Sequence, residues 1–275
     1  MGINKIGIIA GEGEFPFLVA HGTSDVGYIP YVVAFKGHTR KEIGTICPNI
    51  IWVHVGQLGK IINFLKKNNV KQIVLAGALN KPKALNIRPD FKAAKLLFRL
   101  KAHSDNEILE TIVKFFQEEG FEVVPPSKFI PSLTMPKGIL TTKRPSKWEI
   151  EDIKYGFPIA KKIGELDIGQ TIVVKQKMVV AVEAMEGTDA TIQRAGTLVK
   201  DGFVVIKIFK PNQSPLVDQP SIGIKTIETM IEAGGSCLAV EADKSLFFQK
   251  KEAISLANKK GISIIGICED LEELE

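Results

Sequence analysis

Short apolar runs alternate with helical segments along most of this chain, and that alternation restricts the folds it can adopt. Lys5 to Ala10 and Gln72 to Ala76 are apolar runs of strand length. Between Leu58 and Asn68, apolar residues instead recur at the spacing of one helix face. Strands that alternate with helices favour a mostly parallel sheet covered by helices, so we predict an α/β fold.

Two capping boxes mark the beginnings of helices. Ser104 with Glu107, and Ser146 with Glu149, have the spacing at which each side chain binds the backbone amide of the other residue. The first pair predicts a helix that ends near Gly120. The second pair predicts a helix that runs to about residue 165.

A proline-rich stretch interrupts the alternation. Residues 127–145 contain Pro131, Pro136 and Pro145 with little periodicity, which is typical of a connection. After it, the β-branched runs 171–174 and 179–184 flank a short polar turn and predict a hairpin. We therefore predict a Rossmann-like N-terminal domain with a mostly parallel sheet (1–126), a linker (127–145), and a C-terminal α/β domain with a mixed sheet (146–275).

Charge and composition narrow the classes of partner. The net charge of +5 is spread over scattered lysines, and only 7% of the residues are aromatic. Surfaces that bind nucleic acids usually carry more closely spaced basic residues and more aromatic residues, so we predict no nucleic-acid partner. No apolar stretch approaches the ~20 residues that cross a bilayer, and no signal peptide opens the chain, so we expect a cytoplasmic protein. Cys47, Cys237 and Cys268 match no disulfide or zinc spacing and are expected to be small buried side chains.

The first candidate motif is a glycine-rich loop between the first strand and the first helix. Gly11, Glu12 and Gly13 lie where backbone amides and a helix N-terminus can receive a phosphate. The third glycine of the dinucleotide fingerprint is missing, and Glu14 would repel an anion. A phosphate site and a plain tight turn both remain open for this loop.

The second candidate motif is a Glu-Gly-Thr-Asp block at a strand-to-helix junction. Glu186 and Asp189 are placed so that both carboxylates can face the start of the helix, with Gly187 and Thr188 between them. Two carboxylates and a hydroxyl beside free amides can hold Mg²⁺ together with a phosphate. The alternative is structural, with Thr188 capping the helix and Asp189 complementing its dipole.

The third candidate motif is a long, proline-rich loop after an apolar strand. Asp218 precedes the next helix, while Lys207 and Lys210 lie upstream of it. Loops of this length inside a compact domain are often functional. A purely turn-forming aspartate is the alternative.

The chain resembles the LpxI family in five segments that occur in the family's order: GIIAGEGEFP, AGALNKP, ELDIGQTIVV, VEAMEGTDATIQRAG and KPNQSPLVDQPSIGIKTI. Members of this family are UDP-2,3-diacylglucosamine pyrophosphatases of lipid A biosynthesis. The resemblance spans nearly the whole chain. Its most specific parts are the Glu-Gly-Thr-Asp and Asp-x-Pro-x-Ile-Gly blocks.

The resemblance implies Mg²⁺-assisted hydrolysis of UDP-2,3-diacylglucosamine to UMP and 2,3-diacylglucosamine 1-phosphate (lipid X), with water attacking the α-phosphorus. It implies two domains that close over the ligand in a cleft, and it makes Asp218 the essential aspartate. The substrate-binding residues that it implies, together with the lysines of the third loop, are Gly11, Glu12, Gly13, Lys81, Gly187, Thr188, Arg194, Lys207 and Lys210.

The chain departs from the family pattern at two places. Lys81 stands where the family usually has an arginine, and a lysine provides a point charge without a bidentate fork. Ser214, Pro215 and Leu216 occupy the stretch in which the family often has an acidic residue and an arginine, so no phosphate contact from that arginine carries over.

Elementary chemistry assigns roles within that frame. An aspartate has an ordinary pKa of ~3.9 and is a poor base at neutral pH, so we expect Asp218 to hold Mg²⁺ with help from Glu186 or Asp189. Lys207 is expected to face phosphate. A substrate with two acyl chains predicts an apolar cleft and peripheral contact with the inner membrane. The resemblance is also compatible with a homodimer.

Two other functions fit the same sequence. The N-terminal half resembles a dinucleotide fold, so a nucleotide-cofactor-dependent oxidoreductase is one alternative. A non-catalytic module that binds a nucleotide or a lipid is the other, because the fold alone does not separate binding from turnover.

Overall fold

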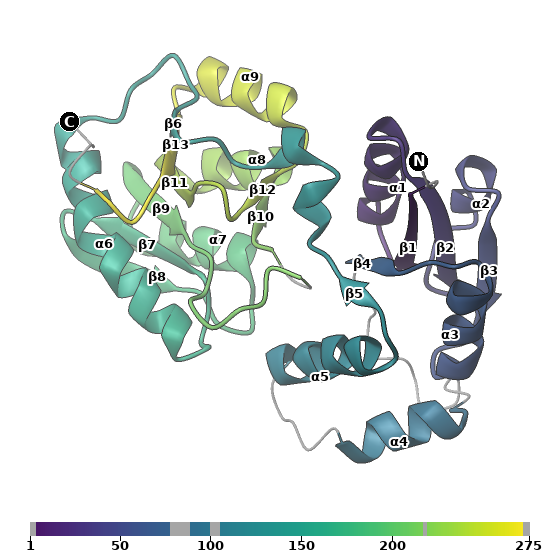
Figure 1. The fold of residues 1–275 in the computed structure, drawn as a ribbon. Coiled ribbons are helices and arrows are strands. Elements are labelled where there is room, and N and C mark those ends of the chain that lie inside the picture. Colours follow the sequence, from purple (N-terminus) through teal and green to yellow (C-terminus); the bar gives the residue numbers. More distant parts are fainter. Residues whose placement is uncertain (1–3, 78–88, 100–104, 217–218, 272–275) are drawn as a thin grey trace. The chain divides into compact units, whose positions relative to one another are not determined.

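The N-terminal part of the chain forms an α/β unit with a parallel sheet (Figure 1). The structure is a computed structural model that describes residues 4–77, 89–99, 105–216 and 219–271. Within those residues, the sheet has the order β3-β2-β1-β4-β5, and all its neighbours pair in parallel. The strands are β1 (Lys5–Ala10), β2 (Ile29–Phe35), β3 (Ile50–Val53), β4 (Gln72–Ala76) and β5 (Glu122–Val123).

Helices pack on this sheet because their apolar faces match its buried residues. In α3, Ile61, Ile62 and Leu65 belong to the same core cluster as Ile9 of β1 and Val33 of β2. β1 is buried along almost its whole length, as expected of a strand covered on both faces. The helices are α1 (Phe15–Asp25), α2 (Ile43–Ile46), α3 (Leu58–Lys67), α4 (Phe91–Arg99) and α5 (Asp105–Glu118).

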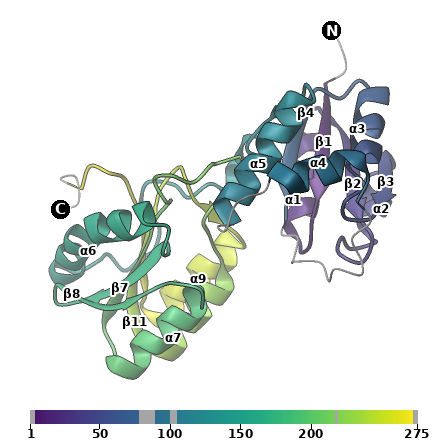
Figure 2. The same ribbon diagram turned by 90° about the horizontal axis from the view of Figure 1, so that it is seen from below.

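The C-terminal part forms a second α/β unit around a mixed sheet (Figures 1 and 2). Among the described residues the order is β6-β13-β11-β9-β7-β8. β9, β11 and β13 run parallel, while β7 is antiparallel to both β8 and β9. The strands are β6 (Gly138–Ile139), β7 (Thr171–Lys175), β8 (Met178–Val182), β9 (Phe203–Lys207), β11 (Gly235–Glu241) and β13 (Ser263–Ile267), beside a small pair of β10 (Ser221–Ile222) with β12 (Leu246–Phe247).

Local chemistry explains two elements of this unit. Ser146 and Glu149 form the predicted capping box at the start of α6 (Lys147–Glu165), with reciprocal side-chain and backbone hydrogen bonds. The β7–β8 hairpin turns through Gln176 and Lys177, which both have positive φ, as a tight two-residue hairpin turn requires. The remaining helices are α7 (Thr188–Leu198), α8 (Ile224–Ala233) and α9 (Lys250–Lys260).

The boundary between the units falls after Pro131, within residues 127–145, which the prolines predicted to be a linker. One unit comprises residues 1–131 with a short piece of chain that begins at Ser214, and the other comprises residues 132–213 and 219–275. Gly138 and Ile139, inside the expected linker, form β6 and pair with β13, and the Met135 side chain is fully buried. The prolines therefore interrupt the periodicity without leaving the segment unpacked.

Several smaller expectations can be compared with the structure. Cys47 and Cys237 are buried free thiols, as predicted, whereas Cys268 is partly exposed. Burial raises the pKa of both buried thiols. The capping residue Ser104 lies outside the described residues. None of the described helices has the length and apolar character needed to cross a membrane.

Candidate functional site

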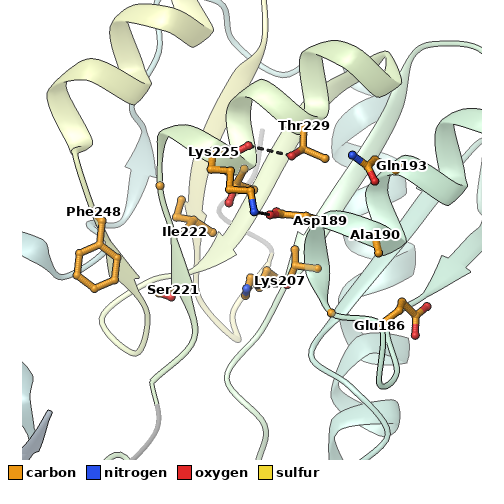
Figure 3. A pocket seen from close by; sticks show the side chains of 14 residues that line it. Glu186, Asp189, Ala190, Gln193, Lys207, Ser221, Ile222, Lys225, Thr229 and Phe248 are labelled. Carbon is orange, nitrogen blue, oxygen red and sulfur yellow. Dashed lines mark hydrogen bonds and ion pairs between the residues drawn. The ribbon is translucent and has the colours of Figure 1, made fainter. Parts of the chain in front are cut away.

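A pocket in the C-terminal unit brings two of the predicted motifs together (Figure 3). Lys207 is the last residue of β9, and its partner across the sheet is Thr171, the first residue of β7. Thr188 begins α7 beside them. The motifs meet here because β8 and β9 end at the same edge of the sheet, and carboxyl edges of strands are where α/β folds usually bind ligands.

A chain of short polar contacts links Lys207 to a buried carboxylate. Nζ of Lys207 donates to Oγ1 of Thr188 at 2.8 Å, and that hydroxyl donates to Oε1 of Glu183 at 3.0 Å. Oγ1 of Thr171 lies 3.3 Å from the same hydroxyl. Lys207 is 5% exposed and Glu183 is 6% exposed. Burying two charged groups costs free energy unless both are hydrogen-bonded or paired. The hydroxyl of Thr188 bonds both groups here and so offsets part of that cost.

Glu183 still has one oxygen available for another group. Among the described residues, no hydrogen-bond donor reaches its buried Oε2. The backbone of Glu183 passes close to Gly169, where a Cβ would lie 2.0 Å from the carbonyl oxygen of Glu183. An unsatisfied buried oxygen is costly, and a bound cation or a donor on a ligand would compensate it.

The N-terminus of α7 opens onto the pocket. Gly187 is the N-cap residue, with φ of 80°, a backbone conformation that favours glycine. The structural alternative in which Thr188 caps the helix is wrong, since Thr188 lies within the helix and its hydroxyl donates to Glu183 instead. The first-turn amides therefore have no side-chain cap in the structure, and they can receive an anion.

Glu186 and Asp189 line the pocket, but each carboxylate pairs with a different cation. Oε1 of Glu186 accepts from Arg194 at 2.8 Å, and Oδ2 of Asp189 lies 3.0 Å from Nζ of Lys225. Hydrogen bonding to its own backbone amide, and then to Arg194, lowers the pKa of Glu186 from its ordinary value of 4.5. Glu186 lies four residues beyond Val182, the last residue of β8.

The rest of the pocket mixes cationic, polar and apolar walls. Its volume is about 630 Å³. Lys207 and Lys225 face it from β9 and α8, and Phe248 with Ile222 forms an apolar side (Figure 3). Positive charge and helix amides suit phosphate oxygens, while the apolar wall suits a carbon-rich group.

The structure brings together only part of the predicted site. Gly187, Thr188, Asp189, Glu186 and Lys207 line the pocket, and Arg194 reaches it through Glu186. Lys210 does not line the pocket. Its Nζ donates instead to Oδ1 of Asp167 at 2.6 Å. Asp218 and Lys81 lie outside the described residues. No group of three candidate metal-binding side chains occurs within the ranges that the structure describes.

Backbone and side-chain contacts hold the glycine loop of the N-terminal unit. The amide of Gly11 donates to Ala76 at 2.7 Å, and Oε1 of Glu12 lies 2.7 Å from Nδ1 of His38. Gly13 has φ of 85° with open space beside it. Glu14, which would repel an anion, forms an ion pair with Arg40.

Two residues at the site were not singled out from the sequence. Glu183 lies three residues before the Glu-Gly-Thr-Asp block, and a carboxylate directly after an apolar strand is a signal that would have found it. Lys225 gave no signal, because its pairing with Asp189 joins α7 to α8 and depends on how those helices pack.

Comparison with known proteins identifies the family. The model of the LpxI N-terminal domain matches residues 5–133, and the model of the LpxI C-terminal domain matches residues 136–265. The UDP-2,3-diacylglucosamine pyrophosphatase LpxI of Caulobacter vibrioides is 30% identical over 276 residues, covering 96% of this chain and 98% of that protein.

The chain belongs to the LpxI family. The boundary between the two matched LpxI domains, after residue 133, agrees with the division of the structure after Pro131. The pocket lies within the LpxI C-terminal domain, because every residue that lines it falls in the matched range.

Proposed function

We propose that this chain hydrolyses the pyrophosphate bond of UDP-2,3-diacylglucosamine, giving UMP and 2,3-diacylglucosamine 1-phosphate in lipid A biosynthesis. The relative from Caulobacter vibrioides carries the name of this activity. The observation that supports the proposal most is the buried Lys207–Thr188–Glu183 chain at the N-terminus of α7. It combines a fixed positive charge with helix amides, and both stabilise phosphate oxygens.

The pocket residues divide the work of phosphate binding. The first-turn amides of α7 bind one set of phosphate oxygens, and Nζ of Lys207 donates to another. Thr188 and Glu183 hold that ammonium group in a single position, so it does not have to reorganise as charge builds up in the transition state. Lys225 at the pocket wall adds positive charge for the leaving phosphate.

Mg²⁺ is part of the proposal, and the donor chemistry fits it. Mg²⁺ prefers oxygen ligands, and the pocket offers the carboxylates of Glu186 and Asp189, with the orphaned oxygen of Glu183 nearby. Asp218 would hold the ion together with Glu186 or Asp189, whose present partners Arg194 and Lys225 would then release them. When bound, the ion neutralises phosphate charge and lowers the pKa of a coordinated water.

Metal dependence is tested by assaying chelator-treated protein with and without added Mg²⁺. We expect turnover only with the metal, and we expect Glu186→Gln or Asp189→Asn to raise the Mg²⁺ concentration needed for half-maximal rate. Asp201→Asn is the matched control, because Asp201 is an exposed aspartate of the same unit that pairs with Lys175. Equal rates with and without metal would contradict the Mg²⁺ part of the proposal.

The substrate also implies where the protein works. Two acyl chains keep UDP-2,3-diacylglucosamine in a membrane, so the enzyme reaches it from the cytoplasmic side by peripheral contact with the inner membrane. The homodimer that the family resemblance admits is a separate prediction, and sedimentation equilibrium of the full chain checks it.

A further inference from the structure

Helix α4 of the N-terminal unit exposes aromatic side chains to an unusual degree. Phe91 is 86% exposed and Phe98 is 87% exposed, and Leu97 beside them is 52% exposed. Single exposed apolar residues are common, but two almost fully exposed phenylalanines on one short helix are not. α4 lies at the edge of its unit, packed against α3 and α5 (Figures 1 and 2).

The two phenylalanines lie on the same face of the helix. They are seven residues apart, which is two turns, so their side chains project in nearly the same direction. Lys95, also exposed, lies between them on that face. The opposite face is anchored, because Ala93 and Leu96 are buried and Leu96 belongs to the core cluster of the unit.

The charges of α4 are all positive. Lys92, Lys95 and Arg99 are its ionisable residues, and it has no acidic residue. Lys92 forms an ion pair with Glu119, and Arg99 forms one with Glu118 of α5, so these two fix the helix on its unit. Lys95 projects outward with the phenylalanines.

We propose that α4 is the element that docks this protein on an anionic lipid surface. Phe91 and Phe98 enter the boundary between headgroups and acyl chains, and Lys95 extends its ammonium group to the lipid phosphates. Cationic and aromatic side chains interleaved on one face match a negatively charged bilayer better than they match an apolar protein groove. The proposal rests on the proposed function only for the reason to visit a membrane, namely a lipid substrate.

The experiment is co-sedimentation of the full-length protein with vesicles rich in phosphatidylglycerol and with neutral phosphatidylcholine vesicles. We expect binding to the anionic vesicles that weakens as salt is added, since exposed charges are screened. The double variant Phe91→Ser/Phe98→Ser should lower the partition coefficient about a hundredfold, because each immersed phenylalanine contributes on the order of one tenfold step. Lys95→Glu should lower it further on anionic vesicles alone.

The control variant is Leu166→Ser/Leu198→Ser, which removes two apolar side chains of the other unit that are 71% and 62% exposed. It should bind vesicles like the unaltered protein. Both double variants should keep the same melting temperature, because the substituted side chains are exposed.

Three results would overturn the proposal: no binding of the unaltered protein to anionic vesicles, unchanged binding of the α4 variant, or a loss of self-association instead of a loss of vesicle binding. The last would make a second copy of the chain the partner of α4. Hydrolysis of substrate dispersed in detergent micelles separates this proposal from the proposed function. The α4 variant should hydrolyse micellar substrate normally, whereas an unaltered protein that binds vesicles but hydrolyses nothing would contradict the activity alone.

Discussion

Lys207 is only 5% exposed, and burying a charged ammonium group costs free energy unless it is hydrogen-bonded or paired. Its ammonium group donates to Thr188, whose hydroxyl donates to the buried carboxylate of Glu183. The arrangement holds a positive charge at the pocket in one orientation. The sequence indicated Lys207 as a phosphate ligand, but the supporting role of Glu183 depends on burial, which no spacing in the sequence reports.

Replacing Lys207 with methionine should lower turnover about a hundredfold or more, because one preorganised donor to a transition-state charge is worth on the order of 10²–10³ in rate. Lys207→Arg should retain part of the rate, since it keeps the charge but not the geometry. The measurement is steady-state hydrolysis together with the melting temperature. Lys175→Met on the neighbouring strand β7 is the control, and it should leave the rate unchanged; equal losses in both variants would contradict the role of Lys207.

Glu186 gives a prediction about pH. Its pKa is lowered from 4.5 by its backbone hydrogen bond and by Arg194, so the carboxylate is charged at every pH above that value. Its contribution to stability is therefore present above the ordinary pKa and is lost as the pH falls through the lower folded-state pKa. Arg194→Met should raise the pKa of Glu186 toward 4.5, as measured by NMR titration of the labelled side chain. An unchanged or lower pKa in this variant would contradict the ion pair.

At the scale of elements, periodicity and caps predicted most of the fold. β1, β4 and the capping box of α6 agree with the structure residue by residue, because each is encoded by neighbours in the sequence. α4 and α9 were not expected, and each buries only two residues in the structure. β6 was missed because two residues become a strand only through pairing with β13.

Close packing at one helical glycine leads to a stability prediction. A Cβ at Gly22 of α1 would lie 2.2 Å from the carbonyl oxygen of Phe129, whereas a Cβ at Gly44 of α2 would meet nothing within 4 Å. Gly22→Ala should lower the free energy of unfolding by about 1–3 kcal/mol through overpacking. Gly44→Ala, the matched control, should be neutral or slightly stabilising. Urea unfolding measures both, and a tolerated Gly22→Ala would show that Phe129 does not pack as described.

At the scale of the whole molecule, the chain is two α/β units, each with its own sheet and core. The resemblance identified the family from five segments, and the structure joins the second motif to Lys207 in a single pocket of the C-terminal unit. The pairing of Asp189 with Lys225 could not be predicted, because it joins residues 36 positions apart through the packing of α7 on α8. Asp218 lies outside the described residues, so its role stays a prediction from the family resemblance and from the chemistry of a carboxylate.

The most direct test of the account incubates the purified protein with UDP-2,3-diacylglucosamine and Mg²⁺ in ¹⁸O-labelled water and analyses the products by mass spectrometry. We predict that the label appears in UMP and not in 2,3-diacylglucosamine 1-phosphate, and that Asp218→Ala produces neither compound. Formation of no UMP with any divalent metal, or a rate in Asp218→Ala equal to that of the unaltered protein, would contradict the account.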